Sequence, residues 1–189
     1  ATDERGLLIV ITGNGKGKST SGFGTVARAV GHGLNAAVAQ FIKGTWACGE
    51  RQLLENAGVK FSVMGTGFTW NTQDKEKDIA AAKQVWQKCK ELLSDTNLDL
   101  VLLDEMGKAL DFCSNENKDL YIFQQLADIA QKSDNKIVLI GFLHQPFTEY
   151  TKNKNSKLQE DWAKVQGRYR DVGYNPSVDE SLLLLGDAI

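Results

Sequence analysis

Residues 7–19 read LLIVITGNGKGKS, and this stretch decides the fold. It begins with a short apolar run, residues 7–11, of the kind that forms a buried strand in a parallel sheet. A glycine-rich turn follows, and residues 18–33 then have a helical pattern closed by Gly31 and Gly33. A strand, a glycine-rich turn and a helix in this order predict a loop whose backbone N–H groups bind phosphate at the start of the helix.

The loop also supplies the side chains that a nucleotide triphosphate needs. In the usual pattern, G-x-x-x-x-G-K-[ST], Lys18 would reach the β- and γ-phosphates and the Ser19 hydroxyl would bind Mg²⁺. Thr12 occupies the place of the first glycine, so the loop is effectively one residue shorter. The alternative is a chance glycine-rich turn, which the flanking strand and helix make improbable. The sequence therefore predicts ATP with Mg²⁺ as the ligand.

The composition is typical of a single globular domain, residues 1–189. Hydrophobic residues make up 42% of the chain and charged residues 24%, with only 2 prolines. A net charge of −2 offers no basic field for nucleic acid. No apolar stretch approaches the ~20 residues of a membrane helix. Because Cys48, Cys89 and Cys113 form no CxxC pair, we expect three reduced thiols in a cytoplasmic protein, without a disulfide framework or structural zinc.

Strands and helices alternate after the loop. Strands are predicted at 36–42, 59–64, 98–103 and 136–141, with a last edge strand at 182–185, and helices at 50–56, 75–93, 120–131 and 156–166. This alternation predicts an α/β fold with a mostly parallel sheet of five to six strands flanked by helices. In the longest helix, the residues expected on the buried face are Ala80, Val85, Trp86, Cys89, Leu92 and Leu93.

Polar and glycine-rich segments follow several of the predicted strands. They are Lys43-Gly44-Thr45, Gly67-Phe68-Thr69-Trp70, Asp104-Glu105 and His144. Ligands of parallel sheets bind at the carboxyl ends of the strands, so we expect these segments to lie near the phosphate loop. Asp104 and Glu105 end an apolar strand, and carboxylates there can hold Mg²⁺ directly or through water. Two solvated acids after a strand are the alternative, which the phosphate loop disfavours.

Seven stretches, distributed in order over residues 4–105, resemble the ATP:corrinoid adenosyltransferases of vitamin B12 assembly and salvage. They are Glu4-Arg5-Gly6, TGNGKGKST (12–20), ARAVGHG (27–33), QFIKGTW (40–46), GERQLLE (49–55), GTGFTWNTQ (65–73) and LLDE (102–105). The resemblance implies a RecA-like P-loop fold, a homodimer and a flavoprotein reductant. It also implies transfer of the 5′-deoxyadenosyl group of ATP to the Co(I) of a corrinoid, cobalamin or cobinamide, with release of triphosphate.

The resemblance also assigns roles to residues. ATP with Mg²⁺ would be bound by Gly13, Asn14, Gly15, Lys16, Gly17, Lys18, Ser19 and Thr20, and Glu105 would complete the metal site with Ser19. Phe68 and Trp70 match the aromatic pair that displaces the lower axial ligand of Co(II), although core packing is their alternative. Lys43, Thr45, Trp46 and Arg51 would belong to the same pocket. Arg28 could contact phosphate or lie on the helix surface, with neither favoured.

After Glu105 the sequence departs from the family pattern, because it lacks the closing Thr-Gly-Arg-Gly and the tail. Residues 106–112, 139–147 and 160–169 instead look like the segment that follows the acidic strand in other large P-loop ATPases. There, His144-Gln145 would be a sensor of the γ-phosphate; a capped loop before Pro146 is equally favoured. Two alternatives to adenosyl transfer follow: a P-loop hydrolase fragment, or a chimeric nucleotide-binding domain without catalysis.

We also expect residues 106–189 to complete the same sheet, because residues 1–105 supply only about four strands and would leave their apolar faces open. Residues 136–141 form an apolar strand suited to pair beside the phosphate-loop strand. The helix at 120–131 is long enough to cross over between them. The loop that follows this strand lacks the Gly-Arg-Gly segment, so the adenine and corrinoid contacts made there must differ. We therefore expect ATP binding to persist and adenosyl transfer to be slow or lost.

Overall fold

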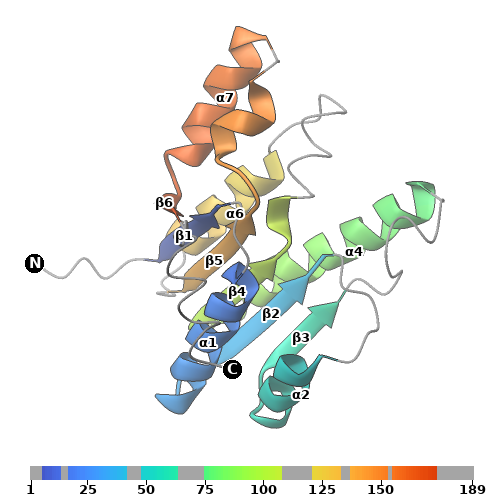
Figure 1. Ribbon diagram of the computed structural model, residues 1–189, viewed down its shortest axis with the longest axis vertical. Coiled ribbons are helices and arrows are strands. Elements are labelled where there is room, and N and C mark those ends of the chain that lie inside the picture. Colours follow the sequence, from blue (N-terminus) through green and yellow to red (C-terminus); the bar gives the residue numbers. More distant parts are fainter. Residues whose placement is uncertain are drawn as a thin grey trace, which may run out of the picture.

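The computed structural model describes residues 6–13, 17–41, 48–63, 75–107, 121–132, 137–152 and 155–173. The strands are β1 (Leu7–Thr12), β2 (Ala36–Gln40), β3 (Lys60–Val63), β4 (Leu100–Asp104), β5 (Val138–Leu143) and β6 (Arg170–Gly173). The α-helices are α1 (Lys18–Gly31), α2 (Gly49–Asn56), α4 (Lys75–Leu93), α6 (Tyr121–Lys132) and α7 (Ser156–Gln166), with a 3-10 helix η1 at Phe147–Thr151. Strands and helices alternate as the sequence predicts (Figure 1).

The six strands form one parallel sheet in the order β3-β2-β4-β5-β1-β6. β5 pairs with β1 from Leu7↔Val138 to Thr12↔Leu143, which confirms the prediction that this strand lies beside the phosphate-loop strand. β6 was not predicted; it is short and exposed, and it lacks an apolar face. The predicted edge strand at 182–185 lies outside the described residues. β5 and β6 thus add two strands from the second half of the chain to the sheet.

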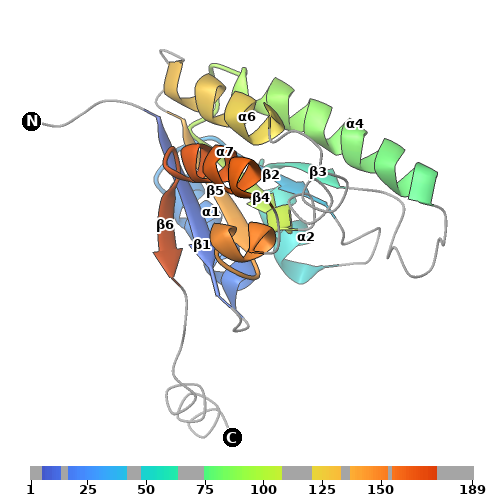
Figure 2. The same cartoon turned by 90° about the horizontal axis from the view of Figure 1, so that it is seen from above.

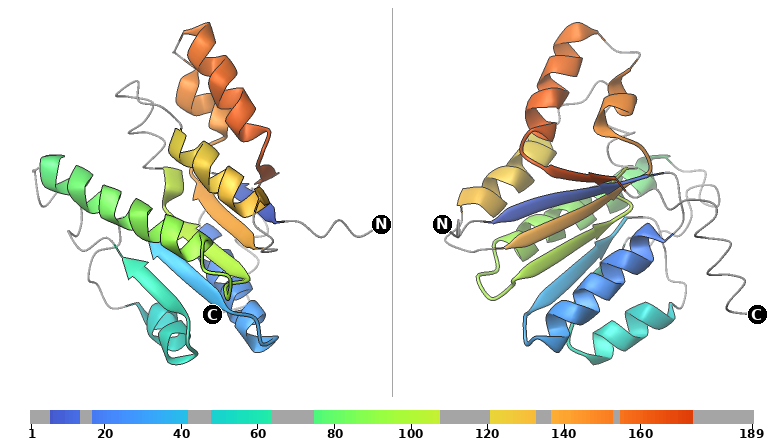
Figure 3. Two further views of the ribbon diagram at one scale, coloured as in Figure 1. Left: turned by 180° about the vertical axis from the view of Figure 1, so that it is seen from behind. Right: turned by 60° about the vertical axis from the view of Figure 1, so that its left-hand side comes forward.

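Helices cover both faces of the sheet, because successive residues of each strand point to opposite sides. Ile9 and Ile11 of β1 face the core beneath α1 and α2, where Phe23, Val26 and Leu54 pack. Leu8 and Val10 face the opposite core, built with Trp86 of α4 and Phe123 of α6. The two helical layers are visible on either side of the sheet in Figures 2 and 3. This three-layer arrangement confirms the predicted RecA-like α/β fold.

The longest helix is α4, and its buried face agrees with the sequence prediction except at one residue. Val85, Trp86, Cys89, Leu92 and Leu93 are buried, and Trp86 meets the ring of Phe123 edge-on at 5.2 Å. Ala80 is exposed, so its predicted burial is wrong. A small side chain carries a weak hydrophobic signal and tolerates either environment. Within the described residues, no helix has the length and hydropathy required to span a membrane.

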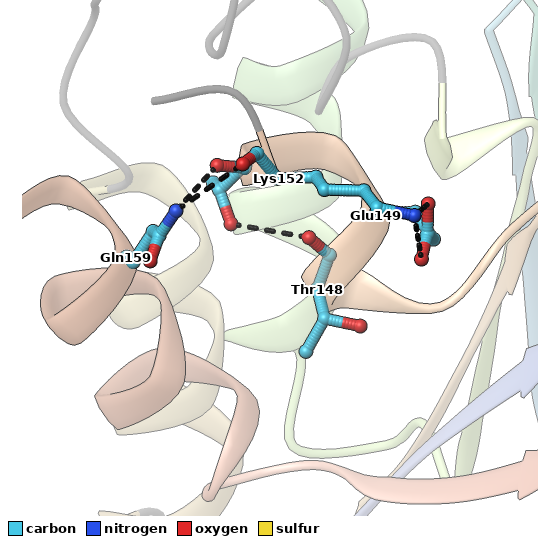
Figure 4. A network of polar contacts seen from close by, with 5 residues as sticks. Thr148, Glu149, Lys152 and Gln159 are labelled. Atoms are coloured by element: carbon cyan, nitrogen blue, oxygen red, sulfur yellow. Dashed lines mark hydrogen bonds and ion pairs between the residues drawn. The ribbon is translucent and has the colours of Figure 1, made fainter. Parts of the chain in front are cut away.

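η1 and α7 form a helical pair that extends beyond the sheet (Figure 1). Asn155 caps α7, because its side-chain oxygen accepts a hydrogen bond from the backbone N–H of Leu158 at 2.9 Å. Trp162 of α7 is 2% exposed and stacks on Tyr150 of η1 with ring centroids 6.1 Å apart. On the polar side, the Gln159 amide donates to the carbonyl oxygens of Thr151 and Lys152 (Figure 4). These contacts join the two helices to each other.

Candidate nucleotide-binding site

The phosphate loop connects β1 to α1 at the carboxyl edge of the sheet. Gly17 is the N-cap of α1 and has a φ of 102°, a conformation that strains residues with a Cβ. Its carbonyl oxygen accepts the N–H of Ser21 at 2.8 Å, which opens the helical ladder. Asn14, Gly15 and Lys16 lie outside the described residues, so their predicted phosphate contacts stay predictions. Gly13, Gly17, Lys18, Ser19 and Thr20 are brought to the start of α1, as expected.

The Lys18 side chain bonds back to the first part of the loop. Its side chain is 8% exposed, and Nζ donates to the carbonyl oxygen of Gly13 at 2.6 Å. Burial lowers the pKa of the Lys18 ammonium, and the negative charge of Glu105 acts in the opposite direction. A buried cation at a helix N-terminus, beside backbone N–H groups, is suited to a phosphate chain. The Lys18 side chain therefore spans the loop to Gly13, while its contact with phosphate remains a proposal.

A polar network lies directly behind the loop and consists of the half-buried Ser19 and the buried Asp104 and Gln40. The Ser19 hydroxyl donates to Asp104 Oδ1 at 2.9 Å, and the Gln40 amide donates to Asp104 Oδ2 at 3.0 Å. Asp104 is 1% exposed and Gln40 2%. The predicted convergence of the phosphate loop with the acidic strand is thus confirmed. The network contains one residue, Gln40, whose role the sequence analysis did not predict. The available signal was a polar side chain at the last position of an apolar strand.

The second acid, Glu105, has a different environment from Asp104. It follows β4 with a φ of 64°, an uncommon conformation for a residue that is not glycine. Its Oε2 lies 2.8 Å from His144 Nε2, which follows β5. The side chains of Glu105 and His144 are 21% and 53% exposed. The structure therefore brings the predicted residues Glu105 and His144 together, while the oxygen that contacts Ser19 belongs to Asp104.

Arg28 lies apart from the loop. It occupies the last turn of α1 and is exposed. It lies ten positions after Lys18, which corresponds to about 15 Å along a helix. Arg51 pairs with Glu55 at 2.8 Å, and its guanidinium lies over the Phe61 ring at 5.8 Å. The remaining predicted pocket residues, Lys43, Thr45, Trp46, Phe68 and Trp70, lie outside the described residues.

The parallel sheet and the bond that joins Ser19 of the loop to the strand-end Asp104 define a P-loop protein of RecA-like fold. Sequence comparison then specifies the family within this class. A sequence model described as "ATP:corrinoid adenosyltransferase BtuR/CobO/CobP" matches residues 4–141, and the chain belongs to this family. The match continues beyond Glu105 to Gly141, so it gives no support to a chimera joined at the acidic strand.

Individual relatives agree with the family match. The chain is 63% identical over 106 residues to the corrinoid adenosyltransferase of Escherichia coli K12, covering 56% of this chain and 54% of the relative. The values are the same for the corrinoid adenosyltransferase CobA of Salmonella typhimurium LT2. The chain is 46% identical over 149 residues to the corrinoid adenosyltransferase of Pseudomonas aeruginosa, covering 77% of this chain and 71% of the relative. The chain thus spans about half the length of the first two relatives.

Proposed function

We propose that this protein transfers the 5′-deoxyadenosyl group of ATP to the cobalt of a corrinoid, cobalamin or cobinamide, and releases triphosphate. The chain belongs to the adenosyltransferase family, and its relatives carry that activity in their names. The observation that carries the proposal is the contact of Ser19 with Asp104 behind a loop that also holds the buried Lys18. This arrangement can bind a triphosphate and stabilise the negative charge that develops on it as it leaves.

Mg²⁺ fits the oxygen atoms at this site. Ser19 Oγ and Asp104 Oδ1 lie 2.9 Å apart at the start of α1, and both are hard oxygen donors. Mg²⁺ usually takes one or two carboxylates and completes its shell with water and phosphate oxygens. We propose that Ser19 and Asp104 hold the ion, with Glu105 as the second carboxylate. Bound there, Mg²⁺ would offset charge on the phosphates.

The proposed reaction needs no nucleophile from the protein. The Co(I) substrate attacks C5′ of ATP, a Co–C bond forms, and the bond from C5′ to the triphosphate oxygen breaks with its electron pair leaving on triphosphate. The protein must orient ATP and offset the negative charge that develops on the leaving group. Lys18 and the backbone N–H groups at the start of α1 are suited to that task.

We propose that Phe68 and Trp70 form the corrinoid side of the site. The family resemblance assigns them the displacement of the lower axial ligand of Co(II), which makes reduction to Co(I) accessible. Their segment follows β3, at the same edge of the sheet as the phosphate loop. Parallel strands present their carboxyl ends together, so the segment begins on the side where ATP would bind.

The remaining parts of the proposal concern the whole protein. Residues 1–189 would form a single nucleotide-binding domain, since β5 and β6 complete the sheet that β1–β4 begin. The protein would act as a homodimer in the cytoplasm and receive electrons from a flavoprotein. Arg28 lies in the last turn of α1, at the end of the helix far from the phosphate loop. It would therefore contribute to binding only through a part of the ligand that lies away from this loop.

The reaction products test the proposed function. Incubation with ATP, Mg²⁺ and chemically reduced Co(I) corrinoid should give triphosphate and an adenosylated corrinoid, at a slow rate because the closing Thr-Gly-Arg-Gly is absent. Chromatography measures the triphosphate, and the visible spectrum of the corrinoid measures its adenosylation. ADP and phosphate as the products would instead indicate the hydrolase, and unchanged ATP a binding domain without catalysis.

Lys18→Ala tests the nucleotide site separately from the chemistry. Loss of a charge-assisted contact should weaken ATP binding by about 1.5–3 kcal/mol. Titration calorimetry of the variant and the parent protein measures the difference. Equal ATP affinities of the two proteins would show that Lys18 does not contact the nucleotide.

The double change Phe68→Ala and Trp70→Ala tests the corrinoid side. Use of Co(II) corrinoid should be abolished, while prereduced Co(I) corrinoid should still be adenosylated and the melting temperature should change little. Core aromatic residues would instead cost about 3–5 kcal/mol each. A large fall in melting temperature with failure of both substrates would show that the pair belongs to the core.

A further inference from the structure

Gln40 and Asp104 are the last residues of two neighbouring strands. β2 and β4 pair in parallel, and in their register Gln40 lies directly opposite Asp104. Phe41 N–H also donates to the Asp104 carbonyl oxygen at 3.3 Å, so the backbones stay joined at this point. Sheet pairing therefore brings the Gln40 side chain to the acid that contacts the phosphate loop.

Each oxygen of the Asp104 carboxylate receives a different donor. Oδ1 accepts the Ser19 hydroxyl at 2.9 Å, and Oδ2 accepts the Gln40 amide nitrogen at 3.0 Å. A carboxylate only accepts hydrogen bonds, so the Gln40 amide must present its NH₂ group to Asp104. In the flipped orientation the amide oxygen would face the carboxylate oxygen, and both atoms are acceptors. The two bonds together define the rotation of the carboxylate about its Cβ–Cγ bond.

The chemical type of the donor matters at a cation site. Lysine or arginine in place of Gln40 would orient the carboxylate but would also compete with a bound cation for its charge. A neutral amide supplies the hydrogen bond and leaves the negative charge of the carboxylate available. At 2% exposure, Gln40 makes this bond with little competition from water.

We propose that Gln40 is a positioning residue for metal-bound ATP: it holds Asp104 in the orientation that presents Oδ1 to Ser19 and to Mg²⁺. The inference rests on the proposed function, because it assigns Mg²⁺ to Ser19 and Asp104. Gln40 acts through Asp104 and needs no contact of its own with the nucleotide.

The test is Gln40→Met, which keeps the length and approximate volume of the side chain and removes the amide. Calorimetry measures the dissociation constant of ATP with Mg²⁺ and with EDTA. The ratio of the EDTA constant to the Mg²⁺ constant reports how strongly the metal supports binding. In Gln40→Met this ratio should fall roughly tenfold, the effect of losing a hydrogen bond to a charged group. ATP binding in EDTA should stay within about twofold of the parent, a difference well below that tenfold step.

Gln159→Met is the matched control, because it makes the same chemical change away from the loop. The Gln159 amide donates to the carbonyl oxygens of Thr151 at 3.1 Å and Lys152 at 3.4 Å, between η1 and α7 (Figure 4). Gln159 is exposed, unlike Gln40, so this control should change stability little and leave the ratio unchanged. Gln40→Asn is a second variant for the case in which Gln40→Met does not fold, since it keeps an amide but is one methylene too short to reach Asp104.

A double-mutant cycle tests whether Gln40 acts through Asp104. In an Asp104→Ala background, Gln40→Met should leave the ratio unchanged, because the group that it positions is gone. A purely structural role for Gln40 would lower the denaturation midpoint of Gln40→Met while preserving the parent ratio, and that result overturns the inference. If the parent protein itself binds ATP no better with Mg²⁺ than with EDTA, the proposed metal site fails and the inference fails with it.

Discussion

The network of Ser19, Asp104 and Gln40, in which the acid and the amide are buried, differs from the turn that begins one residue later at Glu105. Asp104 is 1% exposed and accepts a bond on each carboxylate oxygen. Glu105 has a side chain 21% exposed and bonds to His144, whose side chain is 53% exposed. Two adjacent acids therefore have opposite environments, and interactions of equal length should contribute unequally to stability and binding.

Backbone direction explains the difference. Asp104 is still part of β4, paired with Gln40 of β2, and its side chain is held inside the sheet edge. Glu105 has a φ of 64°, which turns the chain out of the strand. Hydrogen bonds among buried groups are costly to break, because the orphaned partners find no water. Polar contacts between exposed side chains, such as the one between Glu105 and His144, are weakened by competition with water.

Asp104→Ala should have the largest effect. It leaves the buried Gln40 amide and the half-buried Ser19 hydroxyl without this acceptor, and an orphaned buried group costs about 1–3 kcal/mol. Support of ATP binding by Mg²⁺ should be lost in the same variant. Urea denaturation and calorimetry measure the two effects.

Asp171→Ala is the control for Asp104→Ala. Asp171, on the exposed strand β6, accepts the hydroxyl of the buried Thr12 at 3.0 Å. Its loss removes one hydrogen bond, at about 1–3 kcal/mol, where Asp104→Ala removes two, so Asp171→Ala should destabilise the protein less. Equal destabilisation by the two changes would remove the distinction between buried and exposed acids.

Gly22→Ala should have an intermediate effect by moving α1 away from the sheet. A Cβ on Gly22 would lie 2.2 Å from the Phe142 ring, so the buried ring or the helix must shift. Such overpacking costs about 1–3 kcal/mol. Because α1 carries Ser19, the shift should also weaken the contact with Asp104 and the support of ATP binding by Mg²⁺.

Gly24→Ala is the matched control on the same helix. A Cβ on Gly24 meets nothing within 4 Å, so alanine should raise stability by about 0.5–1 kcal/mol through its helix propensity. Opposite signs for the two glycines in thermal denaturation are expected. Stabilisation by Gly22→Ala would show that α1 does not require this close approach.

His144→Ala should have the smallest effect on stability. The pair with Glu105 is half exposed on the histidine side, and such pairs contribute about 0–1 kcal/mol. A double-mutant cycle with Glu105→Gln measures the coupling between the two side chains. A coupling energy above about 2 kcal/mol would exceed the range of exposed pairs. It would show that this turn is as tightly constrained as the network behind the loop.

Most of the sheet could be predicted because its strands are apolar runs. β2, β4 and β5 are buried along most of their length, and β1 alternates buried with half-buried apolar residues, so composition alone marks all four. β6 could not be predicted, because Arg170–Gly173 is exposed and has no apolar pattern. Its strand conformation comes from pairing with β1 and from the bond between Thr12 and Asp171. Ala80 was misassigned for a related reason, since alanine is compatible with either face of a helix.

The sequence by itself determined the phosphate loop, the alternation of strands and helices, and the family. These features depend on local pattern: glycine where φ is positive, apolar runs where a strand is buried, and a lysine and a serine at the helix start. Only the tertiary structure decided that Asp104 contacts Ser19, that Gln40 holds its second oxygen, and that Glu105 turns toward His144. Those contacts depend on strand register and on one backbone angle, which join residues 64 and 85 positions apart and are not encoded in any single local stretch.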